Sequence, residues 1–418
     1  MNRAEIIAVG SELLTPYRLD TNSLFLTEEL NRLGLVVIRK SVVADDRQAL
    51  AAAFREALER ADLVVSTGGL GPTEDDLTRE AAADALNRRL LLDESVLEKI
   101  RERFARLGRT MAPNNQRQAM VPEGATVLPN ASGTAPGLWI ETGGRALLLL
   151  PGPPGELRRI FTERARPLIE PRAGARRMAH RMLRTVGLAE SDVDHRVAPI
   201  YQSYADVETT ILATPEGIEI HLTRWGEDRA ESARVLDELA ARIAATLGDA
   251  VFSTEGETLD AAVARELQQA GLTVAVAESC TGGIVSSRLT RIPGSSLFFL
   301  GGAVCYSNQM KTAWAGVPAE LIERHGAVSS EVAIALAEGA RRATGAALAL
   351  GITGIAGPSG GTPEKPVGTV HIALAHEGGV SEQLVFFAGD RERIRRLAAQ
   401  SALDILRRHL LRARRERG

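Results

Sequence analysis

The sequence predicts an α/β protein in three parts: a three-layer α/β domain, a small α+β middle module and a second α/β domain. The chain has 418 residues, more than a single hydrophobic core usually holds. Near both ends, short apolar runs alternate with segments of helical periodicity, which is the pattern of strands alternating with helices. A segment with a different order of elements separates them. We place the domains at residues 1–172, 173–254 and 255–418.

In the first domain the apolar runs predict buried strands, and the segments between them predict helices. The predicted strands are Ile6–Val9, Leu35–Val43, Asp62–Thr67 and Ala146–Leu150. The predicted helices are Asn22–Leu33, Gln48–Arg60 and Glu74–Leu86. Asp20 and Asn22 are candidate caps for the first helix, because short polar side chains accept hydrogen bonds from a helix's first N–H groups.

The middle module follows a predicted linker at Pro171–Gly174. Its pattern is strand, helix, hairpin, helix, strand. The hairpin is predicted around Pro215–Gly217 and the long helix at Arg229–Leu247.

The third domain is rich in glycine and other small residues. A helix is predicted from Leu259, followed by a strand at Thr273–Ala277, a loop at Glu278–Gly283 and a helix from Ile284. A further strand is predicted at Phe298–Val304. The order again indicates an α/β sheet with ligand-binding loops at its carboxyl edge.

Composition excludes several classes of protein. The net charge of −3 gives no reason to expect nucleic acid or an anionic membrane as a partner. Two cysteines cannot organise a chain of this length by disulfides, which favours a reducing compartment. No apolar run approaches the roughly 20 residues that span a bilayer, and the first residues lack the core of a signal peptide. We therefore expect a cytoplasmic protein.

The first candidate site is the turn that begins at Ser279. It follows a buried strand and precedes a helix, so its hydroxyl would lie where open α/β sheets bind ligands. N–H groups of the following helix could hold an anionic oxygen. A serine in such a turn is also a common helix cap, and the turn alone leaves both interpretations open. Cys280 is a competing nucleophile, because a thiol at a helix start can have a lowered pKa.

A second cluster, Tyr306–Lys311, follows the strand Phe298–Val304. A serine nucleophile needs a base, and a lysine can act as one when burial or a nearby charge keeps it neutral. Ser–Lys pairs are a known alternative to Ser–His–Asp. The plain alternative is that Lys311 is a surface cation on a helix. A third cluster, Gly351–Pro358 with Lys365–Val370, has the glycine density that allows close backbone approach to a ligand.

These clusters together resemble the CinA family and its stand-alone relatives, the nicotinamide-nucleotide amidases. The family patterns A-E-S-C-T-G-G, Y-S-N-x-x-K and K-P-V-G-T-V match Ala277–Gly283, Tyr306–Lys311 and Lys365–Val370. Further similar segments are Gly354–Pro358, Pro293–Ser296, Gly326–Ser329 and Gly389–Arg391. The match covers essentially the whole third domain.

The resemblance implies hydrolysis of nicotinamide mononucleotide to nicotinate mononucleotide and ammonia, without a cofactor, by a homodimeric enzyme. Ser279 would be the nucleophile, Lys311 the base and Tyr306 a relay or orienting hydroxyl. The substrate-binding residues implied or suggested beside it are Glu278, Thr281, Gly282, Gly283, Ser295, Ser296, Thr353, Gly354 and Arg391.

The amino-terminal domain carries its own candidate site after the strand Asp62–Thr67. Glycines at such a strand-to-helix turn make an anion cradle. Asp75 and Asp76 would repel a phosphate unless a cation intervened, and carboxylates suit Mg²⁺ held together with phosphate oxygens. The alternative is that these acids only favour a helix N-terminus. The loops Gly10–Leu14 and Pro151–Glu156 follow other strands and converge on the same place.

This domain resembles the molybdopterin-binding fold of MoaB- and MogA-like proteins, in the version found in CinA proteins. The resemblance implies an ADP-ribose pyrophosphatase that uses a divalent metal (Mg, Mn or Co), with potassium as an activator. Molybdopterin adenylation and plain nucleotide binding stay open. Asp75 and Asp76 would hold the metal. The implied nucleotide-binding residues are Gly10, Glu12, Gly68, Gly69, Gly71, Pro151 and Gly152.

The middle module corresponds to what is called a KH-like module in this family. An RNA-binding KH domain needs a G-x-x-G loop, and none occurs between Ala173 and Ser253. We therefore expect a spacer or dimerisation role. A DNA-uptake accessory, which the family's name suggests, would need a basic face that the near-neutral composition does not favour.

Overall fold

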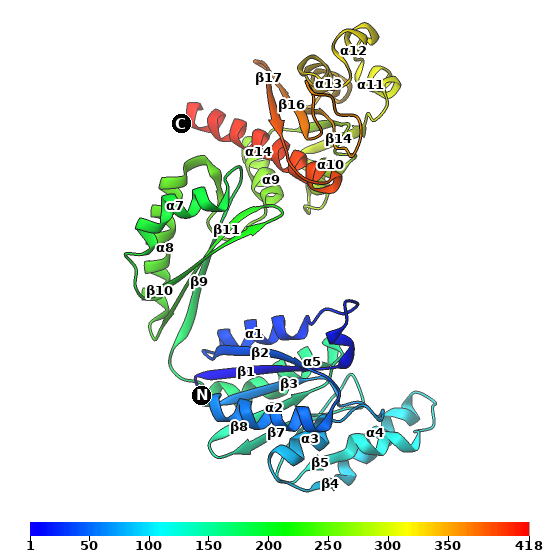
Figure 1. Cartoon of the computed structure of the whole chain (residues 1–418), viewed down its shortest axis with the longest axis vertical. Helices are drawn as coiled ribbons and strands as arrows, with labels where there is room; N and C mark the ends of the chain where they lie inside the picture. Colours follow the sequence, from blue (N-terminus) through cyan, green and yellow to red (C-terminus); the bar gives the residue numbers. More distant parts are fainter. Residues whose placement is uncertain (418) are drawn as a thin grey trace. The chain divides into compact units, whose positions relative to one another are not determined.

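The computed structural model describes residues 1–417 and divides into two compact units (Figure 1). The first comprises Met1–Met178 with Trp225–Glu231, and the second comprises Ala179–Arg224 with Ser232–Gly418. Within the described residues, no helix combines the length and apolarity needed to cross a membrane.

The first unit is built on a six-stranded sheet of order β2-β1-β3-β8-β7-β6. Four strands are parallel: β1 (Arg3–Val9), β2 (Val36–Val43), β3 (Leu63–Thr67) and β8 (Arg145–Leu150). Two antiparallel strands complete the sheet: β7 (Gly137–Thr142) and β6 (Thr126–Leu128). Because the parallel strands run the same way, the loops after Val9, Thr67 and Leu150 lie at one edge of the sheet.

Helices cover both faces of this sheet. One face packs against α1 (Asn22–Arg32) and α5 (Pro154–Ile160), and the other against α2 (Arg47–Arg60) and α3 (Thr78–Ala85). Alternation along each strand supplies both cores: Ile6 belongs to the first and Ile7 to the second. The remaining elements are η1 (Ser11–Leu14), β4 (Leu90–Leu92), α4 (Glu94–Arg106), η2 (Pro113–Ala119), β5 (Met120–Pro122), η3 (Phe161–Ala165), α6 (Arg166–Ile169) and η4 (Glu170–Arg172).

Two details differ from the sequence-based expectation. The helix expected from Glu74 begins only at Thr78, because Asp76 turns back and accepts hydrogen bonds from the backbone of the preceding loop. Asp20 does hold the start of α1, through an Oδ1 that accepts from the N–H of Ser23 at 2.9 Å. Asn22 does not cap this helix; its side chain points to the neighbouring strand loops instead.

The middle module has the predicted order of elements. Its sheet has the order β10-β11-β9-β12. The strands are β9 (Arg177–Thr185), β10 (Val207–Thr214), β11 (Gly217–Gly226) and β12 (Val251–Ser253). Its helices are α7 (Glu190–Tyr201) and α8 (Arg229–Leu247), with a short η5 (Gly248–Ala250).

The carboxy-terminal domain has a five-stranded sheet of order β14-β13-β15-β16-β17. The strands are β13 (Val274–Glu278), β14 (Phe299–Val304), β15 (Leu348–Gly354), β16 (Thr369–His376) and β17 (Gly379–Phe386). The first three are mutually parallel, and β16 and β17 are antiparallel to their neighbours. The helices are α9 (Leu259–Ala270), α10 (Ile284–Thr290), α11 (Asn308–Ala315), α12 (Ala319–His325), α13 (Ser330–Thr344) and α14 (Arg391–Arg417), with η6 (Ser295–Leu297) before β14.

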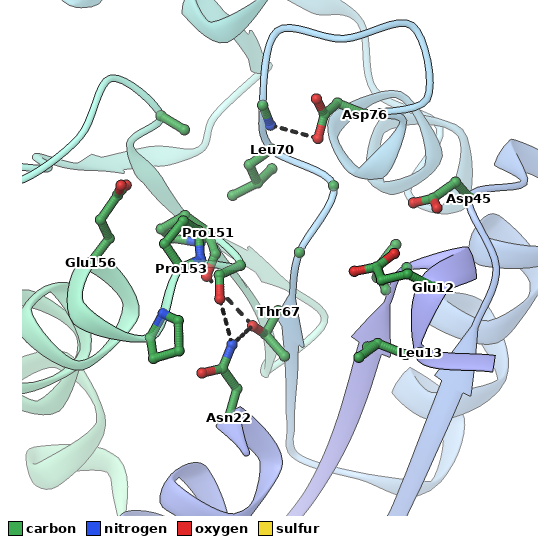
Figure 2. A pocket seen from close by; sticks show the side chains of 18 of the residues that line it. Glu12, Leu13, Asn22, Asp45, Thr67, Leu70, Asp76, Pro151, Pro153 and Glu156 are labelled. Carbon is green, nitrogen blue, oxygen red and sulfur yellow. Dashed lines mark hydrogen bonds between the residues drawn. The ribbon is translucent and has the colours of Figure 1, made fainter. Parts of the chain in front are cut away.

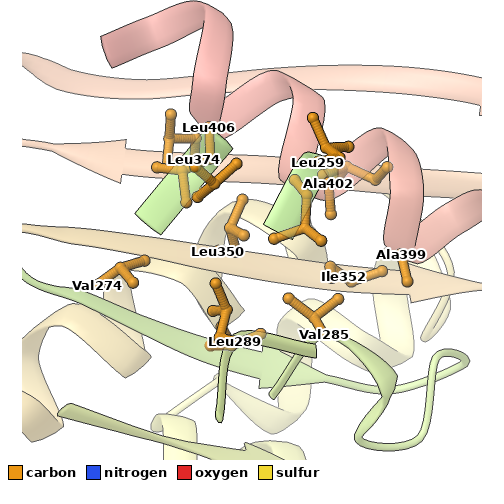
Figure 3. Close-up of a cluster of buried hydrophobic side chains, with 14 of the residues drawn as sticks. Leu259, Val274, Val285, Leu289, Leu350, Ile352, Leu374, Ala399, Ala402 and Leu406 are labelled. Carbon is orange, nitrogen blue, oxygen red and sulfur yellow. The ribbon is translucent and has the colours of Figure 1, made fainter. Parts of the chain in front are cut away.

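The core on one face of this sheet joins α9, α10 and α14 to the strands (Figure 3). In this view Leu406 of α14 lies beside Leu374 of β16, and both belong to the same core as Leu350 of β15. The other face packs against α11 and α13 through a core rich in alanine. The predicted fold classes of all three domains are confirmed.

Candidate functional site

Ser279 is placed directly after β13, at the carboxyl edge of the sheet. Its N–H continues the strand pairing by donating to the carbonyl of Ile352 at 3.0 Å. Its own carbonyl accepts from the N–H of Gly282 at 3.1 Å, which closes a tight turn. We call residues Ser279–Gly282 the nucleophile turn. The strand and the turn together fix the backbone from which the Ser279 hydroxyl projects.

Lys311 brings its amine to this hydroxyl. The side chain comes from α11 and is only 2% exposed. Nζ lies 3.1 Å from Ser279 Oγ, 3.0 Å from the carbonyl oxygen of Cys305 and 3.2 Å from that of Tyr306. A neutral amine has two N–H donors and one lone pair. A neutral Lys311 that donates its two N–H groups to the two carbonyls would leave its lone pair for the Ser279 hydroxyl.

Burial lowers the pKa of Lys311 from its ordinary value. Its hydrogen-bond partners are two carbonyls and a hydroxyl, all uncharged. Within residues 1–417, no carboxylate forms an ion pair with this amine. The surface-cation alternative is therefore wrong, and burial makes the neutral form that a base requires easier to reach than it is for an exposed lysine.

Burial acts in the opposite direction on the neighbouring thiol. It raises the pKa of Cys280 to about 12, so this cysteine stays protonated near neutral pH and is a poor nucleophile.

Replacing Cys280 by alanine is therefore expected to leave the kcat of the deamidation that the motifs imply within about threefold of wild type. The substitution removes a buried thiol and leaves the Ser279 hydroxyl and the Lys311 amine in place. Steady-state kinetics on the purified variant measures this, and a loss beyond about 100-fold would return Cys280 to candidacy as the nucleophile.

Glu278 requires a correction. We expected it to bind substrate, but its carboxylate is fully buried and caps the helix α10. One oxygen accepts from the N–H groups of Gly283 and Val285, and the other from the N–H and hydroxyl of Ser286. These N–H groups are consequently not free for a substrate oxygen, contrary to the expectation that the helix start would hold one.

Tyr306 also differs from its expected role. It precedes α11 and is 58% exposed. Its hydroxyl accepts from Nη2 of Arg391 at 2.7 Å, whereas only its carbonyl contacts Lys311. Nη1 of Arg391 donates to the carbonyl of Gly357 at 2.8 Å. The two side chains therefore join neighbouring loops at the same edge of the sheet, and Tyr306 does not link Ser279 to Lys311 as a relay.

The other expected substrate contacts divide into two groups. Thr353 and Gly354 end β15 beside the nucleophile turn. Thr281 lies within the turn, and its buried hydroxyl has no hydrogen-bond partner among residues 1–417. Ser295 and Ser296 lie elsewhere: they precede β14, which is parallel to β13, so they sit at the opposite edge of the sheet from Ser279. Within one chain the structure does not bring them to this site.

The amino-terminal residues meet at a cavity of about 750 Å³ at the carboxyl edge of the first sheet (Figure 2). All the expected nucleotide and metal residues line it: Gly10, Glu12, Gly68, Gly69, Gly71, Asp75, Asp76, Pro151 and Gly152. Asn22, a predicted cap of α1, donates to Thr67 Oγ1 at 3.0 Å and to the Gly152 carbonyl at 2.7 Å. It thereby ties two of the cavity loops together.

Val9 and Arg79 fix the backbone of the glycine turn Gly68–Gly71, which lines this cavity. Gly68 has a φ of +105°, and a Cβ there would lie 2.3 Å from the carbonyl oxygen of Val9. Arg79, 1% exposed, donates to the carbonyls of Leu70 at 2.6 Å and Gly71 at 2.8 Å. Sequence reasoning missed Arg79, because an arginine in an otherwise ordinary helix start carries no signal that it is buried.

The acids of the cavity are not equivalent. Asp76 uses both oxygens on the loop, accepting from the N–H groups of Gly71 at 2.8 Å and Thr73 at 2.9 Å. Asp75 is exposed, and the Thr73 hydroxyl lowers its pKa. Glu12 and Asp45 lie near each other on one side of the cavity (Figure 2). Across residues 1–417, no group of three His, Cys, Asp or Glu side chains is arranged to hold a metal alone.

Comparison with known proteins gives three family matches in series. Residues 5–171 match the probable molybdopterin binding domain, residues 180–253 the damage-inducible protein CinA KH domain, and residues 256–410 the CinA C-terminal domain. The chain is 50% identical over 414 residues to a CinA-like protein of Acidobacterium capsulatum, covering 98% of this chain and 100% of that protein.

Two further similarities carry related names. A putative competence-damage inducible protein of Symbiobacterium thermophilum is 44% identical over 420 residues, covering 98% of this chain and 99% of that protein. A crystal structure of the protein CinA with unknown function from Thermoplasma acidophilum is 37% identical, covering 40% of this chain and 98% of that one, with a TM-score of 0.38.

Proposed function

The chain belongs to the CinA family, and we propose that its carboxy-terminal domain is a hydrolytic amidase that converts nicotinamide mononucleotide to nicotinate mononucleotide and ammonia. The observation that carries the proposal is the buried pair of Ser279 and Lys311, with 3.1 Å between hydroxyl and amine. The nicotinamide substrate is what the sequence motifs imply. The pair supports the reaction class, because it is the arrangement that activates a serine for attack on an amide carbon.

In the proposed reaction, Ser279 Oγ attacks the carboxamide carbon while its proton passes to Nζ of Lys311. Collapse of the tetrahedral intermediate breaks the carbon–nitrogen bond, and Lys311 returns the proton to the departing ammonia. Water then attacks the acyl ester, giving a proton to Lys311. Collapse of the second tetrahedral intermediate breaks the ester bond to Ser279 Oγ, and Lys311 passes the proton to Oγ, which releases the carboxylic acid and restores the Ser279 hydroxyl.

The donors for the tetrahedral oxyanion can be identified from which N–H groups near Ser279 already donate to a carbonyl or a carboxylate. Those of Ser279 and Gly282 pair with backbone carbonyls, and those of Gly283, Val285 and Ser286 pair with Glu278. The other two N–H groups of the nucleophile turn, those of Cys280 and Thr281, pair with no carbonyl or carboxylate among the described residues and lie beside the Cys280 sulfur, which is only a weak acceptor. The N–H of the residue after a serine nucleophile commonly forms part of an oxyanion hole. We assign this role to these two groups.

The direct test is formation of ammonia and nicotinate mononucleotide from nicotinamide mononucleotide by the purified full chain. Both products should appear in equal amounts, without added metal. A folded protein that releases neither product would contradict the proposed substrate.

A second candidate function belongs to the amino-terminal cavity, and its size and acidic lining favour it. We propose that it hydrolyses the diphosphate of ADP-ribose with a divalent metal. Exposed carboxylates such as those of Glu12 and Asp75 fit a hard cation that is held together with phosphate oxygens. The bound ion would neutralise phosphate charge as a Lewis acid. Molybdopterin binding is the alternative.

Replacing Asp75 by asparagine is expected to lower metal-dependent release of AMP from ADP-ribose by about 10-fold or more, because one anionic ligand is lost. The matched control is Asp84→Asn on α3 of the same domain, whose carboxylate pairs with Arg47 away from the cavity lining. Product release is followed by chromatography across a metal titration. Equal activity in both variants would remove Asp75 from the site.

A further inference from the structure

Helix α14 places Arg395 against the nucleophile turn. Its Nε donates to the carbonyl of Cys280 at 3.1 Å, and its Nη2 donates to the carbonyl of Thr281 at 3.0 Å. Gly282 comes so close that a Cβ there would lie 2.8 Å from Nη2. Neither the family motifs nor the spacing of residues assigned Arg395 to the site. It is 116 positions along the chain from Ser279.

These two hydrogen bonds determine the orientation of the peptide groups in the nucleophile turn. In a planar trans peptide the C=O and N–H point in opposite directions. Holding the Cys280 carbonyl therefore directs the Thr281 N–H to the other side of the turn. Holding the Thr281 carbonyl likewise directs the Gly282 N–H, which donates to the carbonyl of Ser279. The hydrogen bond from Gly282 to the Ser279 carbonyl also fixes the Ser279–Cys280 peptide group, which carries the Cys280 N–H.

One guanidinium therefore sets the direction of both N–H groups that we assign to the oxyanion. Its own position is fixed, because Ile394, Ala398 and Ala399 of the same helix are buried in the core beneath the sheet. The planar fork of an arginine holds two carbonyls with little loss of side-chain entropy. Glu278 holds the far end of the turn through the start of α10, so the turn is restrained from both sides.

We infer that Arg395 is a positioning residue for the amidase reaction, which orients the Cys280 and Thr281 N–H groups toward the developing oxyanion. The inference rests on the proposed function of the Ser279 site. Arg395 acts through the backbone of the nucleophile turn; its recorded hydrogen bonds go to these two carbonyls and to neither Ser279 Oγ nor Lys311. Without the guanidinium, the peptides can rotate and the oxyanion loses its donors.

The test compares Arg395→Ala with Arg396→Ala in the full chain. Arg396 is the next residue of the same helix, its side chain is half exposed, and its nearest acid is Glu392 at 3.9 Å. For Arg395→Ala we expect kcat to fall about 100-fold with KM changed little, since loss of oxyanion donors acts on the transition state. Arg395→Lys, which keeps the charge without the fork, should recover only part of kcat. Arg396→Ala should behave as wild type.

A second measurement does not depend on the nucleotide substrate. A fluorophosphonate probe reacts with an activated serine: the bond from Ser279 Oγ to phosphorus forms, fluoride leaves, and the serine proton passes to Lys311. The phosphoryl oxygen gains negative charge as the carboxamide oxygen does. The rate of Ser279 labelling, followed by mass spectrometry, should therefore fall in Arg395→Ala and not in Arg396→Ala.

The two measurements distinguish failure of the proposed substrate from failure of the role inferred for Arg395. Labelling of wild-type Ser279 without turnover of nicotinamide mononucleotide would refute the proposed substrate, while the comparison of the two arginine variants would still decide the role of Arg395. Equal labelling rates in Arg395→Ala and wild type would overturn the inference. So would a fall in kcat accompanied by a shifted pH profile, because that would mean Arg395 acts on the pKa of Lys311 rather than on the turn.

Discussion

Replacement of Ser279 by alanine is expected to abolish deamidation, lowering kcat by about 10⁴- to 10⁶-fold. The substitution removes only Oγ and its proton, and the proposed acyl intermediate cannot form without Oγ. The turn should keep its shape, because its hydrogen bonds are made by the backbone, Glu278 and Arg395. Ammonia release measured beside circular dichroism and thermal unfolding tests both halves of this expectation.

The matched control is Ser287→Ala, which makes the same substitution at an exposed position of α10 in the same domain. It should retain wild-type kcat. Residual turnover in Ser279→Ala within about 10-fold of wild type would rule out the covalent scheme. Attention would then move to a water activated directly by Lys311.

Replacement of Lys311 by methionine is expected to lower kcat by about 10²- to 10⁴-fold, the usual contribution of a general base. Methionine fills nearly the same space without an amine. Lys311→Arg should not restore activity, because a guanidinium stays protonated and cannot accept the serine proton. Lys99→Met, at an exposed position of α4, is the control for the substitution itself. Wild-type kcat in Lys311→Met would exclude the lysine as base.

The lowered pKa of Lys311 predicts that both kcat and folding stability depend on pH. Activity needs the neutral amine, so kcat should rise with pH through the pKa of Lys311, which burial places below the ordinary 10.5. The folded state also binds this proton less well than the unfolded chain. Between the two pKa values the unfolded state carries more protons, so stability should rise with pH across that window. Below the window, Lys311→Met should be more stable than wild type. Calorimetric Tm values across the pH range measure this, and an equal or lower Tm in the variant would contradict it.

Much of the architecture could be predicted because it follows from local pattern. Apolar runs gave the strands that carry both sites, and the helix Arg229–Leu247 was placed at the bounds that the structure has. Errors arose where a side chain redirected the backbone. Asp76 delays the start of α3, and Asn22 joins two loops instead of capping its helix. Nothing in the periodicity of these segments distinguishes such a side chain from an ordinary helix start.

The roles within the proposed amidase site divide in the same way. Motif and strand order predicted that Ser279 and Lys311 would meet, since both follow parallel strands at the same sheet edge. The partners of Glu278 and Tyr306 could not be predicted, because a carboxylate or a phenol near an active site can equally well bind substrate or hold a loop. Ser295 and Ser296 were assigned to the site from motif alone. The direction of β14 places them at its other edge.

The sequence by itself thus predicted the fold classes, the family and the meeting of Ser279 with Lys311. These depend on local periodicity and on short motifs, which a linear reading captures. Only the tertiary structure decided that Lys311 is buried among uncharged groups, that burial raises the pKa of the Cys280 thiol and that Arg395 holds the nucleophile turn. The reason is physical: the pKa of a group and the partner of a guanidinium depend on solvent exclusion and on contacts between distant segments, and neither is encoded in neighbouring residues.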